Sequence, residues 1–143
     1  SDSALQKCLN GLSPQAWYEM LNRKVFFWVT RDRLIRLLCA RAYRERRHCV
    51  ITVNTQKLLE RHMKRISLSP INSGSTIFNP QPRGRSTFSS LADYPFDYWR
   101  QRRGRSGAVV ELAVDYHVPD IKDLALRVEH RQAEKIIEVL FER

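Results

Sequence analysis

The chain has 143 residues, enough for one domain with a sizeable core. It contains no run of about 18 apolar residues, which excludes a transmembrane helix. The formal net charge of +10, carried mostly by arginine, favours partners that bear phosphate. Three cysteines at positions 8, 39 and 49 lack Cys-x-x-Cys spacing, which argues against a metal site and favours free thiols and a cytoplasmic location.

The N-terminal part of the chain predicts a helix followed by a strand. Ser13 is a suitable N-cap and Pro14 a suitable first residue, because proline lacks the N–H that would have no partner there. The helix has one apolar face, made of Trp17, Met20 and Leu21. The next run, 24–30, is continuously apolar, which predicts a strand covered on both faces.

The next segments again alternate between helix and strand. Thr30 is the expected N-cap of a helix over 31–46. Its inner stripe is predicted to hold Leu34, Leu37, Leu38 and Ala42. The patterns then predict a strand at 48–54, a short helix at 55–65, and a brief strand from Ile66 that Pro70 stops.

Residues 70–107 predict a long loop, because Ser, Asn, Gly and Pro are frequent there. Short strands are expected at 75–78 and 86–88, and a helical segment after Pro95. Aromatic residues argue against disorder. We expect the loop to pack over one end of the sheet, with the "RQRRGR" segment exposed or disordered and with burial of one or more of Phe88, Phe96 and Trp99.

Order returns in the last third. A central strand is predicted at 108–115, paired on both sides, and a last strand at 123–130. The segment 131–143 predicts a closing helix with Ala133, Ile136, Ile137 and Leu140 inward. These elements predict one α+β domain over 1–143, with a mixed, mainly antiparallel sheet, flanking helices and a long central loop.

Glu111 is the unusual residue of the central strand. It shares a face with Val109 and Ala113 in an otherwise apolar run. A carboxylate in such a place must be paired, protonated or beside a wet cleft. Two interpretations follow: an ion pair with an arginine, or a carboxylate that takes part in chemistry.

Three basic blocks stand out, at 41–48, 61–65 and 100–105. For the first two we favour solvated helix faces. The third interleaves arginines with aromatics in a glycine-containing segment, which is typical of nucleic-acid contacts. The residues predicted to bind nucleic acid are Tyr98, Trp99, Arg102, Arg103 and Arg105.

The order "VVELAVDYHVPDI", then "LALRVEH", then a predicted closing helix, resembles the C-terminal third of DarT-type DNA ADP-ribosyltransferases. Glu111 stands where that family has its catalytic glutamate, and Val118-Pro119-Asp120-Ile121 stands at the turn after the strand. Residues 20–130 also look similar to an uncharacterised bacterial family of the same type, on the segments "LNRKVFFWV", "LSPINSGST", "PRGRSTF" and "VVELAV".

The resemblance implies a sheet of ADP-ribosyltransferase type and an NAD-dependent transferase that acts on nucleic acid, with Glu111 catalytic, NAD as substrate and no metal. The residues expected to contact NAD are Asn72, Ser73, Ser75, Thr76, Arg83 and Arg85. It also implies a protein partner such as an antitoxin. The family places an H-x-T-like strand before the first helix, and this chain shows none before 13–22. Two expectations follow: either that strand was lost or cut away, or the chain is not a working transferase. The alternative is a non-catalytic basic module of the same fold that binds nucleic acid or protein.

Overall fold

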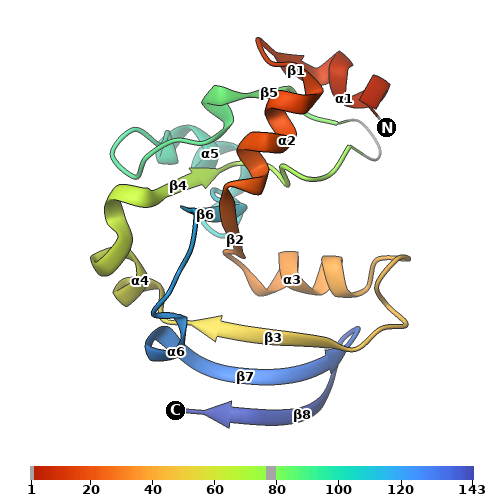
Figure 1. The fold of residues 1–143 in the computed structure, drawn as a ribbon, viewed down its shortest axis with the longest axis vertical. Coiled ribbons are helices and arrows are strands. Elements are labelled where there is room, and N and C mark those ends of the chain that lie inside the picture. Colours follow the sequence, from red (N-terminus) through yellow and green to blue (C-terminus); the bar gives the residue numbers. More distant parts are fainter. Residues whose placement is uncertain (1, 77–79) are drawn as a thin grey trace. The chain divides into compact units, whose positions relative to one another are not determined.

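The computed structural model describes residues 2–76 and 80–143. They form two compact units, one within 1–29 and 65–117 and the other within 30–64 and 118–143 (Figure 1). The described residues hold six α-helices and three small, mostly antiparallel sheets, which confirms the α+β class. The expectation of a single domain stays a prediction. None of the helices in the described ranges is long and apolar enough to cross a membrane.

The first unit is built around a three-stranded antiparallel sheet in the order β2-β6-β4. Its elements are α1 (Asp2–Cys8), β1 (Leu9–Asn10), α2 (Pro14–Asn22), β2 (Lys24–Trp28), β4 (Ile66–Ser69), β5 (Arg83–Gly84), α5 (Phe96–Arg103) and β6 (Glu111–Asp115). The central place predicted for the Glu111 strand is therefore confirmed. The predicted double cover of the 24–30 run is wrong. β2 is an edge strand that ends at Trp28, and Phe26 is 37% exposed.

A small apolar cluster packs the helices of this unit. Leu5, Cys8 and Trp17 are buried in it, and the partly buried residues around them include Met20, Leu21 and Phe88. The cap predicted for α2 is present, because Ser13 Oγ accepts a hydrogen bond of 3.1 Å from the amide of Ala16. The predicted apolar face of α2 is also confirmed, because Trp17, Met20 and Leu21 all belong to this cluster.

The second unit is built around the antiparallel sheet β3-β7-β8, whose strands lie side by side in Figure 1. Its elements are α3 (Arg31–Leu38), β3 (His48–Val53), α4 (Thr55–His62), α6 (Ile121–Leu124), β7 (Ala125–Gln132) and β8 (Lys135–Glu142). Leu38 of α3, Leu58 of α4 and Leu124 of α6 are buried. Glu129 on β7 accepts hydrogen bonds from Arg127 and Arg131 of the same strand. A 3-10 turn, Met63–Arg65, follows α4.

The helix predicted over 31–46 is shorter than expected. Thr30 caps α3 as predicted, but the helix ends at Leu38 and residues 39–46 form turns and bends. Ala42, predicted to lie in the inner stripe, is exposed. Four arginines lie within residues 41–47, and on a helix like charges three residues apart repel one another. A longer helix would also gain little from Ala42, because its side chain has little apolar area to bury.

The closing helix predicted over 131–143 is wrong, and β7 is not the last strand. Residues Lys135–Glu142 form β8, which pairs with β7 after a two-residue turn at Ala133 and Glu134. Ile136 and Leu140, expected to point inward, are exposed. The segment is rich in β-branched and aromatic residues, and pairing with β7 prevails over the helical spacing of its apolar residues.

The long loop is partly as predicted. A helix after Pro95 is confirmed as α5. The strand expected at 86–88 is wrong, because Arg85–Thr87 forms a 3-10 turn in which Gly84 N donates to Thr87 Oγ1. The strand expected at 75–78 falls partly outside the described residues. Phe88, Phe96 and Trp99 are each half-buried, and Tyr94 is buried.

Candidate functional site

Glu111 is the first residue of the central strand β6. In the sheet register it lies opposite Trp28 of β2 on one side and Ser69 of β4 on the other. Residues opposite one another in an antiparallel sheet place their side chains on the same face. Glu111 is 5% exposed and Ser69 is fully buried, so the carboxylate lies within packed protein rather than on an open surface.

The start of the long loop folds against this carboxylate. Ser73 N donates a hydrogen bond of 3.2 Å to Glu111 Oε1. Ser69 Oγ fixes the chain just before, because it donates to Ile71 O at 2.9 Å and accepts from Ile71 N at 3.2 Å. A backbone hydrogen bond of 3.2 Å from Ser75 to Asn72 closes the turn. The hydrogen bond from Ser73 N thus fixes the position of the Glu111 side chain.

Arg83 organises the same loop. Its side chain is 3% exposed, and Nη1 donates to Ser73 O at 3.0 Å and to Ser75 O at 2.7 Å. Nε donates to Gln81 O at 2.9 Å. The guanidinium therefore ties the backbone on both sides of residues 77–79. Arg85, two residues further on, is exposed.

The predicted NAD-contacting residues are thus brought together in part. Ser73 and Arg83 join Glu111 in one connected set of hydrogen bonds. Half-buried Asn72, Ser75 and Thr76 belong to the same loop, whereas Arg85 is exposed. The arrangement holds a fixed carboxylate beside a loop with hydroxyl and amide groups.

A second candidate site is the α5 surface, defined as Tyr98, Trp99, Arg102, Arg103 and Arg105. The Arg102 guanidinium lies over the Tyr98 ring at 3.5 Å from its centroid, and that of Arg103 lies over the Trp99 ring at 4.1 Å. The two rings meet edge to face at 4.9 Å. Arg103 Nη1 also donates to Pro70 O. Sequence reasoning selected these five residues but gave no ring–arginine pairing.

Tyr94 anchors the segment between α5 and β6. Its buried hydroxyl donates a hydrogen bond of 2.5 Å to Ala108 O, and its ring meets Phe96 edge to face at 4.8 Å. Burial raises the pKa of Tyr94 to about 12, an effect that the positive charge of Arg103 partly opposes. The neutral phenol is therefore the form that holds this segment at ordinary pH.

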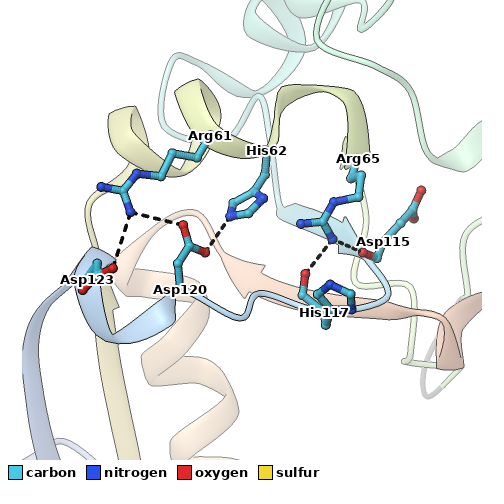
Figure 2. Close-up of polar contacts among 7 residues, drawn as sticks. All are labelled: Arg61, His62, Arg65, Asp115, His117, Asp120 and Asp123. Atoms are coloured by element: carbon cyan, nitrogen blue, oxygen red, sulfur yellow. Dashed lines mark hydrogen bonds and ion pairs between the residues drawn. The ribbon is translucent and has the colours of Figure 1, made fainter.

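The turn after β6 is fixed by polar side chains that sequence reasoning missed (Figure 2). In the first unit, Arg65 Nη1 donates to the carbonyl oxygens of Asp115 and His117, each at 2.6 Å. In the second unit, Asp120 Oδ1 lies 2.6 Å from His62 Nε2, and Asp120 Oδ2 accepts from Arg61 at 3.2 Å.

The hydrogen bond from His62, with a smaller contribution from Arg61, holds the pKa of Asp120 below its ordinary value, against the opposing effect of desolvation. The sequence shows two basic side chains in one segment, Arg61 and His62, and two acids in another, Asp120 and Asp123. It does not show that the two segments meet. In residues 2–76 and 80–143, no group of three or more His, Cys, Asp or Glu side chains is placed to hold a metal ion.

The model of a family of unknown function (DUF7002) matches residues 1–125, and the chain belongs to that family. The match therefore includes the sheet β2-β6-β4 and the loop around Glu111, and it ends at the first residue of β7. No curated protein and no solved structure matches the chain.

Proposed function

We propose that the chain binds nucleic acid through the α5 surface. The observation that carries this proposal is the stacking of two neighbouring arginines on two neighbouring aromatic rings, Arg102 on Tyr98 and Arg103 on Trp99. Guanidinium groups contact phosphates, and both aromatic rings and guanidinium planes stack on bases. The net charge of +10 adds a long-range attraction to a polyanion.

The test is a titration of a fluorescent DNA with the intact chain across about 50 to 200 mM salt. Replacing the exposed Arg102 and Arg105 by alanine should lower the log–log salt slope by about one unit for each phosphate that the variant no longer neutralises. The matched control is Lys7→Ala with Lys57→Ala, because both lysines are exposed and the charge removed is the same. Equal slopes for the wild type and the arginine variant would contradict the proposal.

A second candidate function is NAD-dependent ADP-ribosyl transfer to nucleic acid, by a domain of ADP-ribosyltransferase type with Glu111 as the catalytic carboxylate. The observation that favours it is the fixed position of Glu111 on a central strand, with the Ser73 loop against it. NAD, when bound, supplies the ADP-ribosyl group. Glu111 would accept a hydrogen bond from a ribose hydroxyl and orient the acceptor.

The polar groups of the loop fit this role in part. Asn72, Ser75 and Thr76 are half-buried and carry the amide and hydroxyl groups that bind ribose, and Arg85 is exposed for a phosphate. Arg83 fits less well, because Nε and Nη1 donate to backbone carbonyls. We expect it to hold the loop in place. A protein partner such as an antitoxin stays a prediction.

The Glu111→Gln variant distinguishes a catalytic role of Glu111 from a structural one. The glutamine oxygen still accepts the hydrogen bond from Ser73 N, so the thermal melt should stay close to that of the wild type. Transfer of label from NAD to nucleic acid should fall by about 100-fold if Glu111 is catalytic. A lower Tm for this variant, together with no transfer by the wild type, would reject the transferase and leave Glu111 with a structural role.

A further inference from the structure

The turn that follows α3 concentrates positive charge on the second unit. Residues 40–47, here called the basic turn, carry four exposed arginines: Arg41, Arg44, Arg46 and Arg47. Glu45 is its one acid, and it lies 3.9 Å from Arg44 with both side chains well exposed. An exposed pair of this kind is screened by water and neutralises little. The turn therefore keeps an excess of positive charge.

Backbone hydrogen bonds fix the shape of the basic turn. Tyr43 N and Arg44 N both donate to Ala40 O at 2.9 Å, and Arg46 N donates to Tyr43 O at 2.9 Å. Tyr43 O also lies 3.1 Å from His48 Nε2, and the two rings meet edge to face at 5.7 Å. Since His48 begins β3, the turn is attached to the sheet. The arginines thus extend from an ordered backbone, so binding orders less of the chain.

We infer that the basic turn is a second contact for nucleic-acid backbone, independent of the α5 surface. Among the described residues, no ion pair joins Arg41, Arg46 or Arg47 to a carboxylate, so their guanidinium groups are available to phosphate oxygens. Tyr43 is 38% exposed and adds a ring beside them. The surface has little apolar area to insert into a lipid layer, which favours nucleic acid over a membrane. The choice of partner rests on the proposed function.

The experiment compares three variants of the intact chain against a short fluorescent DNA, as duplex and as single strand. The first carries Arg44→Ala, Arg46→Ala and Arg47→Ala in the basic turn. The second carries Arg102→Ala and Arg105→Ala in the α5 surface. The third carries Lys7→Ala, Lys57→Ala and Lys122→Ala, which removes the same charge as the first from dispersed exposed positions.

The basic-turn variant should bind at least tenfold more weakly than the dispersed variant near 0.15 M salt, and its log–log salt slope should fall by about one unit for each phosphate that it no longer neutralises. Arg44→Lys with Arg46→Lys and Arg47→Lys, which keeps the charge, should restore most of the slope. Equal weakening by the turn and dispersed variants would overturn the inference, as would binding of anionic vesicles in preference to DNA.

The α5 variant separates the two proposals. If it binds like the wild type while the basic-turn variant does not, the α5 surface is rejected as the binding surface and the basic turn is supported. If only the α5 variant is weakened, the basic turn is rejected. If both are weakened, the two surfaces both bind the DNA. Thermal melts check that each variant folds. The Tm of each arginine variant should equal that of the wild type, because the replaced arginines are exposed.

Discussion

The backbone amide of Ser73 donates to the carboxylate of Glu111 at 3.2 Å, although the two residues are 38 positions apart in the chain. This bond attaches the start of the long loop to the central strand β6. The same loop is held from its other end by Arg83, which donates to Ser73 O and Ser75 O. A buried carboxylate and a buried guanidinium thus fix one loop through its backbone, and the loop depends on both.

Arg83→Lys should lower the free energy of unfolding by about 2 kcal/mol, the usual scale for losing hydrogen bonds to a buried charged group. Lysine keeps the charge but lacks the planar fork that reaches several carbonyl oxygens at once. Urea denaturation measures the change. Arg85→Lys is the control, because Arg85 is exposed two positions away and should leave stability unaltered. Equal effects of the two replacements would refute the role given to Arg83.

Tyr94 should make the protein sensitive to alkali. Its pKa rises from 10.0 to about 12 on folding. The neutral phenol is therefore favoured in the folded state, and its contribution is complete below pH 10.0 and is lost as pH rises towards about 12. Tyr94→Phe should cost about 1 kcal/mol at neutral pH and remove this part of the alkaline loss.

Unfolding by urea at a series of alkaline pH values measures this effect. The exposed Tyr98→Phe is the matched control and should keep the alkaline loss of the wild type. A Tyr94→Phe protein that loses stability in alkali as steeply as the wild type would show that another group is responsible.

Elements set by local chemistry could be predicted from the sequence. Ser13 and Thr30 cap their helices as expected, because a hydroxyl placed before a helix reaches its free amides with no help from the rest of the chain. The central place of the Glu111 strand also followed from its continuous apolar run. So did the bonding of Glu111 to a polar group, since the backbone amide of Ser73 donates to its carboxylate.

Elements set by long-range pairing could not be predicted. The apolar residues of β8, such as Ile136 and Leu140, have spacings that suit a helix as well as a strand, and only the presence of β7 decides between them. The hydrogen bonds that join Asp120 to Arg61 and His62 span 59 and 58 positions, so no local sequence pattern predicts them. Arg83 was predicted to bind phosphate from its residue type alone. The sequence does not show that its side chain is buried.

Asp120 should make the protein sensitive to acid. The hydrogen bond from His62 lowers its pKa below 3.8. A carboxyl group with a lowered pKa contributes stability above its unfolded value, and this contribution is lost as pH falls below 3.8 through the folded pKa. Asp120→Asn should therefore be less stable than the wild type at neutral pH, and the difference should shrink in acid.

Urea denaturation from neutral to strongly acidic pH measures the difference. Asp123→Asn is the control, because Asp123 is well exposed and lies 3.9 Å from the same Arg61. It should be close to the wild type at every pH. A constant gap between Asp120→Asn and the wild type down to strong acid would contradict the assigned cause.

Ala133 should be replaceable by glycine with a gain in stability. It lies in the two-residue turn between β7 and β8 and has a φ of 50°, a left-handed conformation that costs a residue with a Cβ about 1–2 kcal/mol. Glycine removes this strain but loses about 0.5–1 kcal/mol through its greater freedom in the unfolded chain. Ala133→Gly should therefore raise the free energy of unfolding by about 0.5 kcal/mol.

Ala42→Gly is the control, because Ala42 also lies in a turn but has a negative φ, and it should lower stability. A loss of stability in both variants, measured by urea denaturation, would show that the turn at Ala133 is not left-handed in solution.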